Sequence, residues 1–271
     1  MLHYLGYFAA IFIGLSLGIM GGGGSILTVP VLVYLMGVSP VLSTAYSLFV
    51  VGSTSLVGAA GYLRKGLVSL KTAVVFLAPS LLAVFVVRTV LIPAIPHEVL
   101  VGGFIVTKDL LVLVAFAVLM VAAATSMIRS RQAEAVLAEE LHQPHAFNYP
   151  LILGIGLVVG TLTGFVGAGG GFLSIPALVL GARLPMKLAV GTSLAIIALN
   201  SLIGFSGDLG AGTPIAWPFL LGFLAFALGG IVLGTYLARF IPGARLKPAF
   251  GWFTLGMGTF ILTKELLFHH A

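Results

Sequence analysis

The stretch Gly14-Leu-Ser-Leu-Gly18-Ile-Met-Gly21-Gly-Gly-Gly24-Ser25-Ile-Leu-Thr-Val-Pro30 is a glycine cluster inside an apolar segment, and it occurs twice. The second copy is Gly160-Thr-Leu-Thr-Gly164-Phe-Val-Gly167-Ala-Gly-Gly170-Gly171-Phe-Leu-Ser-Ile-Pro176. The offset between the copies is 160 − 14 = 146 residues, and it continues without a gap to Ser47-Leu48 and Ser193-Leu194. The chain is therefore a duplicated unit, and each copy carries a candidate helix break.

The composition predicts a helical membrane protein. Hydrophobic residues make up 60% of the chain and charged residues only 7%, whereas a soluble domain carries roughly 25% charged residues. The net charge of +6 then reflects which loops face the cytoplasm rather than a nucleic-acid partner. The absence of cysteine excludes disulfides, thiolate nucleophiles and cysteine-ligated metals.

The fold class we predict is an all-α polytopic membrane protein with about eight to ten membrane segments and glycine-broken helices. The apolar segments run over Tyr4–Met20, Gly22–Gly37, Val41–Leu63, Leu70–Ile92, Val99–Ile128, Tyr149–Val166, Ala168–Gly181, Met186–Ser206, Pro214–Phe240 and Leu246–Leu267. The hydrophilic stretch Arg129–His145 joins the two halves. We predict a first repeat over residues 1–128, a hydrophilic cytoplasmic linker over 129–148 and a second repeat over 149–271.

The second segment of each half is short, which leaves two topologies open: a re-entrant hairpin arm, or a thin crossing buried in protein rather than lipid. Gly22–Gly37 has 16 residues, about 24 Å as a helix against a bilayer core of about 30 Å. If this segment crosses, each half has five spans. Of the lysine and arginine residues, only Arg88, Lys108 and Lys264 then lie away from the cytoplasm. That bias is the one expected of cytoplasmic loops, and it disappears if the segment does not cross. Five is an odd number, so we predict an inverted repeat.

The glycine clusters are candidate anion sites. A helix that restarts after a break presents free N–H groups and the positive end of its dipole. The predicted substrate-binding residues at the breaks are Gly22, Gly23, Gly24, Ser25, Gly169, Gly170 and Gly171. The alternative is close helix packing, for which the Gly14-xxx-Gly18 and Gly160-xxx-Gly164 patterns are typical.

Polar residues within the apolar segments complete the predicted site. Ser47 and Ser193 occupy equivalent positions in the two copies, and Thr192 and Asn200 lie near the second serine. Hydroxyl and amide groups can replace water around an anion without carrying charge. The alternative is that each side chain bonds a carbonyl of its own helix or a neighbouring helix.

Ionisable residues offer little to an enzyme. The histidines all fall at segment edges, in the linker or at the C-terminus, so a serine–histidine catalytic pair inside the membrane is excluded, and we predict no cofactor and no metal site. Lys108 and Asp109 are expected at the interface, and Asp208 at the end of a segment. A proton-relay role for either carboxylate stays open, as does coupling to protons or sodium.

At these residues the chain resembles the TauE/SafE family of sulfite exporters and sulfonate-uptake permeases. The resemblance rests on the duplicated glycine block and its proline, on Ala45-Tyr46-Ser47-Leu48 and on Gly191-Thr192-Ser193-Leu194. It implies transport of a small sulfur-containing anion, such as sulfite, thiosulfate or an organosulfonate, across the inner membrane of a bacterium. It leaves substrate and direction open, because both vary within the family. An anion channel and a membrane-embedded assembly partner are the alternatives, and the sequence leaves the oligomeric state open.

Overall fold

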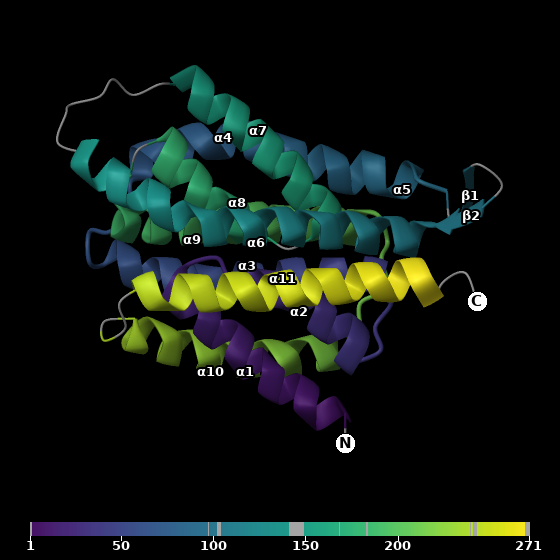
Figure 1. Cartoon of the computed structure of the whole chain (residues 1–271). Helices are drawn as coiled ribbons and strands as arrows, with labels where there is room; N and C mark the ends of the chain where they lie inside the picture. The colour runs from purple at the N-terminus through teal and green to yellow at the C-terminus, as the bar shows by residue number, and fades with distance from the viewer. Residues whose placement is uncertain are drawn as a thin grey trace.

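The chain forms a bundle of helices packed around a buried interior (Figure 1). The structure is a computed structural model, and it describes residues 2–96, 98–101, 104–140, 149–167, 169–182, 184–238, 240 and 243–268. The first half contains α1 (Leu2–Met20), α2 (Ser25–Pro30), α3 (Pro40–Leu63), α4 (Leu70–Val86), α5 (Ile92–Ala94) and α6 (Lys108–Glu140). The second half contains α7 (Tyr149–Val166), α8 (Gly171–Pro176), α9 (Met186–Gly210), α10 (Trp217–Leu237) and α11 (Gly243–Phe268). Helices α2, α4 and α8 each continue into a π-helical turn, at Val31–Leu35, Val87–Leu91 and Ala177–Gly181.

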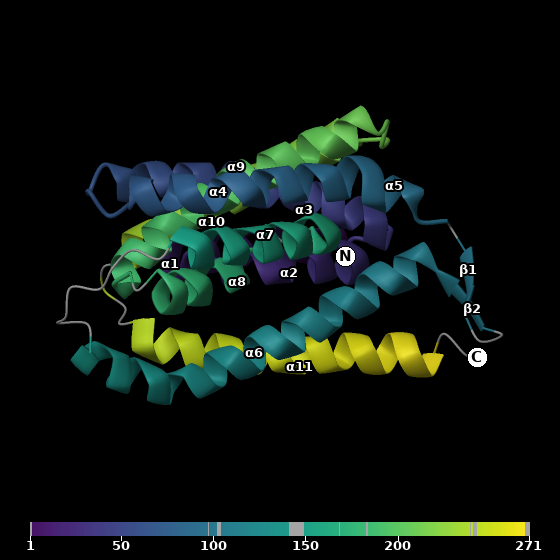
Figure 2. The ribbon, with the colours of Figure 1, turned by 90° about the horizontal axis from the view of Figure 1, so that it is seen from above.

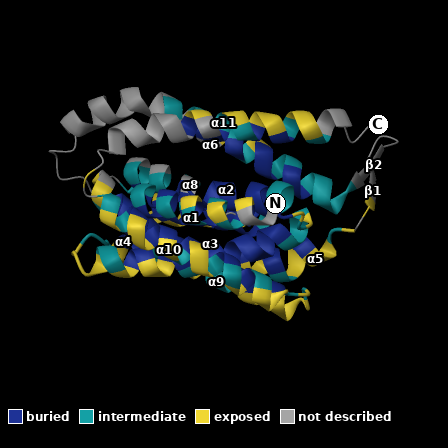
Figure 3. Ribbon diagram, turned by 90° about the horizontal axis from the view of Figure 1, so that it is seen from below, coloured by how far each residue is buried: buried dark blue, intermediate teal, exposed yellow. Residues whose placement is uncertain are grey.

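The bundle has the surface and the helix lengths of a multi-pass membrane protein, which confirms the predicted fold class. Among the described residues, five helical stretches are long and apolar enough to cross a bilayer: Pro40–Leu63, Leu70–Ala94, Tyr149–Val166, Lys187–Gly210 and Trp217–Leu237. Large apolar side chains such as Phe8 and Val74 are exposed on the outside of the bundle, as expected of a surface that faces lipid. Figure 3 shows α2 in the buried interior, and every residue of this helix is buried.

Two stretches depart from the predicted segments. The apolar run Val99–Ile128 is not one segment, because strands β1 (Glu98–Val101) and β2 (Phe104–Thr107) form an antiparallel hairpin before α6 begins. Helix α6 then continues to Glu140, so the first part of the predicted linker is helical. Residues 141–148 of that linker lie outside the described residues, and the predicted domain boundaries stay predictions.

The duplication is visible in how the helices pair. Helix α1 packs along α10, and the equivalent pair, α7 and α4, packs in the same way. The equivalent helices α3 and α9 pack against each other, and α6 and α11 lie side by side as a separate layer (Figure 2). The symmetry extends to single residues: Gly21 contacts Val190, and their counterparts Gly167 and Thr44 are also in contact.

Contacts between α4 and α9 show in which direction these helices run relative to each other. The amide of Ser69 donates to Thr192 Oγ1 over 2.9 Å, and Arg88 pairs with Asp208, so α4 and α9 run parallel. Helix α3 precedes α4 across a short turn and runs the opposite way. Helices α6 and α11 are also antiparallel to each other (Figures 1 and 2). Inversion of the two halves with respect to a bilayer stays a prediction.

After the first glycine break the chain turns back, and this short arm ends near the start of α1. The helical stretch Ser25–Leu35 is about 16 Å long at 1.5 Å per residue, which is half of a bilayer core of about 30 Å. Gly6, near the start of α1, contacts Met36 at the end of this arm. Helix α1 and the arm therefore form a hairpin with its turn at the glycine cluster. Both predicted possibilities, a thin crossing and a re-entrant arm, bring the chain back in this way, so whether the arm crosses the bilayer stays a prediction.

Candidate functional site

The two glycine breaks are in direct contact inside the bundle. A Cβ atom added to Gly171 would lie 2.7 Å from Gly22 Cα, and one added to Gly22 would overlap the backbone of Gly171. No side chain fits between them. The same breaks contain left-handed residues, with φ of 72° at Gly21 and 67° at Gly169, which glycine adopts without steric cost. The clusters therefore serve both a sharp chain reversal and a close approach of two backbones.

The first break presents free backbone donors. Gly22, Gly23, Gly24 and Ser25 are all buried, and the amides of the three glycines donate to none of the described residues. The hydroxyl of Ser25 donates to the carbonyl of Gly22 over 2.8 Å, so it closes the turn at the break. The four predicted residues of the first break thus lie together, with the amides of the three glycines available.

The second break adds two hydroxyl groups. A Cβ atom on Gly169 would lie 2.9 Å from Ser201 Oγ, and one on Gly170 would meet Thr163 Oγ1. Both hydroxyls are buried and have no hydrogen-bond partner among the described residues. Since a buried hydroxyl without a partner is costly, this pair is a candidate ligand set. The sequence signal that could have found Ser201 is its equivalence to Ser55, which is likewise buried and without a described partner.

The paired serines have different surroundings. Ser193 Oγ lies 3.0 Å from the carbonyl oxygen of Gly21 and 2.9 Å from that of Val190, so it can donate to either and connects α9 to the first break. Ser47 Oγ is fully buried and has no described partner. Ser47 follows Thr44 by three residues on α3, and Thr44 contacts Gly167 of the second break. Ser193 therefore has a structural bond, and Ser47 has a free hydroxyl.

The side chains of the other two predicted residues, Thr192 and Asn200, make hydrogen bonds within the protein. Thr192 accepts a hydrogen bond from the Ser69 amide, in the turn before α4. Asn200 Nδ2 donates to Ser80 Oγ over 2.6 Å, which links α9 to α4. The Oδ1 atom of Asn200 is buried without a described partner. The structure thus gives Thr192 and Asn200 packing roles and leaves one acceptor atom of Asn200 unused.

A buried ion pair that the sequence analysis missed lies next to the second break. Arg88 is only 1% exposed, and its Nη1 atom donates to Asp208 Oδ2 over 3.1 Å and to Asp208 Oδ1 over 3.2 Å. The same nitrogen also donates to Thr44 Oγ1 over 3.1 Å. A Cβ atom on Gly167 would lie 2.5 Å from the Nη2 atom of Arg88, so the glycine makes room for the guanidinium.

The repeat offset could have revealed this pair. The counterpart of Arg88 is Gly234, and that of Asp208 is Tyr62. Two opposite charges that appear in apolar helices of a duplicated chain, without equivalents in the other copy, indicate function rather than packing. The prediction that Asp208 lies at a segment end is consistent with its place in the last turn of α9, while Asp109 Oδ1 accepts from the Val41 amide and caps α3.

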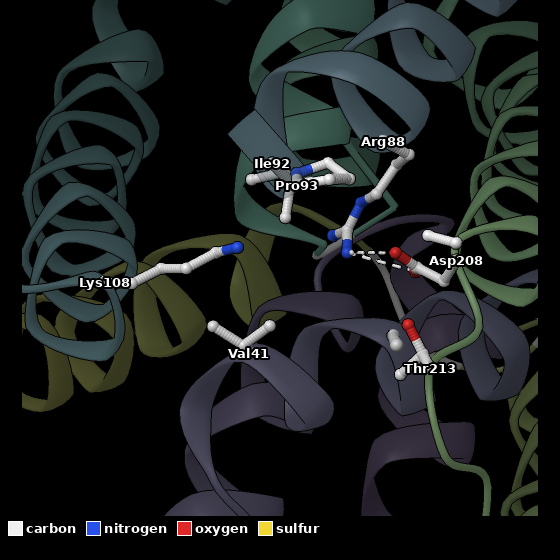
Figure 4. Close-up of a pocket in the computed structure, with 9 residues that line it drawn as sticks. Val41, Arg88, Ile92, Pro93, Lys108, Asp208 and Thr213 are labelled. Carbon is white, nitrogen blue, oxygen red and sulfur yellow. Dashed lines mark hydrogen bonds and ion pairs between the residues drawn. The ribbon is translucent and has the colours of Figure 1, made fainter. Parts of the chain in front are cut away.

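The ion pair lines a cavity of about 150 Å³ at one end of the bundle (Figure 4). Helices α3, α5, α6 and α9 and the π-helical turn Val87–Leu91 surround it. Its lining residues are Val41, Ala45, Arg88, Ile92, Pro93, Lys108, Asp208, Ala211 and Thr213. The cavity thus carries two cationic side chains and one carboxylate, and Arg88 separates it from the second break.

Comparison with known proteins assigns the chain to a family. The family described as "Sulfite exporter TauE/SafE" matches residues 6–261, which include both breaks and the ion pair. The chain belongs to the TauE/SafE family. A "Probable membrane transporter protein" of Xylella fastidiosa (strain 9a5c) is 27% identical to this TauE/SafE protein over 263 residues, covering 93% of this chain and 92% of the relative.

A second TauE/SafE relative comes from another bacterium. The "Probable membrane transporter protein YunE" of Bacillus subtilis (strain 168) is 30% identical over 235 residues, covering 82% of this chain and 83% of the relative. No solved structure matches the chain. The family and the names of its relatives indicate a multi-pass membrane transporter.

Proposed function

We propose that this TauE/SafE protein is a secondary transporter, or a facilitator, that moves a small sulfur-containing anion across the inner membrane. Sulfite, thiosulfate and organosulfonates are the proposed substrates, in line with the name of the family. The observation that carries the proposal is the contact between Gly22 and Gly171, because it brings hydrogen-bond donors of both halves to one buried place.

The chemistry of that place suits an anion. The breaks offer the free amides of Gly22, Gly23 and Gly24 and the hydroxyls of Ser201 and Thr163. Amides and hydroxyls can donate to the several acceptor oxygens of a sulfur oxoanion, and they cost less to bury than charged groups. The same donors would leave an apolar or cationic substrate without partners. We therefore propose that the substrate binds at the breaks, as the sequence predicts, next to the contact between Gly22 and Gly171.

The pairing of the two halves supports a carrier mechanism. Equivalent helices run in opposite directions in the bundle, and equivalent pairs pack alike. We infer that the halves are inverted across the bilayer and that the protein alternates its access by moving one half against the other. The contact between Gly22 and Gly171 leaves no room for a methyl group, which favours a carrier over an open channel.

A transport assay tests the proposal. Purified protein in proteoliposomes is given sulfite, thiosulfate, methanesulfonate or sulfate, with and without proton and sodium gradients. We expect uptake of at least one sulfur anion and faster exchange when unlabelled substrate is present on the opposite side. A channel would show uptake without this acceleration. An assembly partner would show no flux of any anion, and that result would overturn the proposal.

A further inference from the structure

The guanidinium of Arg88 uses one nitrogen and leaves two without partners. All three of its short contacts, to Thr44 and to both oxygens of Asp208, involve Nη1. Its Nε and Nη2 atoms are buried and have no hydrogen-bond partner among the described residues. These two nitrogens form the edge that pairs with two oxygens of an oxoanion through parallel hydrogen bonds. An arginine buried to 1% exposure with that edge unused indicates a ligand.

Lys108 supplies a second cation to the same cavity. It is the first residue of α6 and is partly buried. Figure 4 shows its side chain extending toward Arg88 from the other side of the cavity. The cap that the neighbouring Asp109 forms on α3 fixes the start of α6 at this position. The two cations and the carboxylate of Asp208 give the lining a formal net charge of +1.

We propose that Arg88 and Lys108 form a binding subsite for a singly charged sulfur oxoanion, and that Asp208 makes the subsite select single over double charge. The inference rests on the proposed function and adds a second binding position between the end of the bundle and the breaks. A monoanion such as an organosulfonate or hydrogen sulfite neutralises the lining. A dianion brings an excess negative charge close to the Asp208 carboxylate, and buried like charges repel strongly.

The cavity also fits this class of ligand by size and position. Its volume of about 150 Å³ equals the share of about five water molecules in the liquid, enough for a small organosulfonate. Gly167 of the second break touches Nη2 of Arg88, so an anion held at the guanidinium lies next to the proposed substrate site. Arg88 thereby connects the solvent-side cavity with the interior.

Binding measurements in detergent solution test the subsite without requiring transport. Isothermal titration of the purified full chain compares methanesulfonate, a monoanion, with sulfate, a dianion, at constant ionic strength. We expect Lys108→Gln to weaken methanesulfonate binding about tenfold, the effect of losing one charge-assisted hydrogen bond. Lys264→Gln is the matched control, because Lys264 lies over the Tyr34 ring and does not line the cavity.

The selectivity of the subsite gives the second readout. Asp208→Asn is expected to improve sulfate binding relative to methanesulfonate by about tenfold or more. Arg88→Gln is expected to lose methanesulfonate binding. If that variant fails to fold, the double variant Arg88→Gln/Asp208→Asn, which removes both charges together, is expected to lose it as well. Unchanged affinity in Lys108→Gln and in the double variant would overturn the subsite.

The two proposals fail separately. If methanesulfonate binds with these dependences but no anion crosses the bilayer, the subsite stands and the transport function is wrong. If anions are transported but the variants alter neither affinity nor the preference for monoanions, the transport function stands and the subsite is wrong.

Discussion

Gly22 and Gly171 lie backbone to backbone, although 149 residues separate them in the chain (171 − 22 = 149). Each belongs to a different copy of the duplicated unit, and each is buried. The contact makes one interior place out of two separate sequence motifs. Any movement of one half against the other must change this contact, so it is the first target for mutation.

We expect Gly171→Ala to abolish or strongly reduce sulfur-anion flux while the protein still inserts and folds. Gly171 is the first residue of α8 and has ordinary helical geometry, so alanine is acceptable to the local backbone. Its methyl group would nevertheless lie 2.7 Å from Gly22 Cα, which forces the breaks apart. The measurement is initial uptake in proteoliposomes at equal protein density.

Gly154→Ala is the control for this variant. Gly154 lies in α7, is exposed and has no atom within 4 Å of an added Cβ. Alanine there should leave flux unchanged and favour the helix by up to about 1 kcal/mol. Full activity in Gly171→Ala would mean that the contact between the breaks has no part in transport.

The paired serines should respond differently to alanine. Ser193→Ala removes the bond to the Gly21 carbonyl and should lower stability by about 1 kcal/mol. Ser47→Ala removes a hydroxyl without a described partner, so we expect stability within about 0.5 kcal/mol of the parent protein and a raised KM. Thermal unfolding and uptake kinetics of both variants check this. Equal destabilisation by the two substitutions would contradict the difference in their surroundings.

The Arg88–Asp208 pair should show strong coupling in a double-mutant cycle. Arg88→Gln leaves a buried carboxylate without its cation, which typically costs about 3 to 5 kcal/mol. Adding Asp208→Asn removes the uncompensated charge and should recover much of that loss. Thermal unfolding midpoints of the single and double variants, measured in the same detergent, give the order. Additive effects would show that the two side chains do not stabilise each other.

Gly167→Ala should disturb Arg88 without touching its charge. The position has φ of 71°, where alanine is strained, and an added Cβ would overlap the side chain of Thr44 and approach Arg88 Nη2 to 2.5 Å. We expect lower stability and weaker methanesulfonate binding. Gly66→Ala, in the turn between α3 and α4, has comparable strain, with φ of 69° and nothing within 4 Å of an added Cβ, and should lose stability without losing affinity.

The sequence predicts the helical membrane fold well, because apolar composition and a repeated glycine block are local signals. The return of the short arm could not be derived from them. Its length suits a thin crossing and a re-entrant arm about equally, and only the hairpin with α1 is established, by the contact between Gly6 and Met36. The hairpin at Glu98–Thr107 was missed because apolar strands and apolar helices share the same composition.

The candidate site was predicted in part, for a physical reason. A glycine cluster indicates a helix break by its local sequence alone. The structure places all seven predicted break residues in the interior. The partner of Arg88 is 120 residues away, and no local pattern indicates such a pair. Whether Ser47 or Ser193 is free also depends on neighbours from the other half, so equivalent positions in the sequence acquired different roles.

The Arg88–Asp208 pair has no counterpart, since Gly234 and Tyr62 stand at the equivalent positions. Two inverted halves of identical chemistry would give inward-facing and outward-facing forms of equal free energy. An ion pair present at only one end makes the two free energies unequal, and each difference of about 1.4 kcal/mol changes the ratio of the two forms tenfold. The empty protein would then rest with one particular face closed. If the protein is the carrier with inverted halves that we propose, such a bias would make loading from the two sides kinetically unequal, which amounts to rectification.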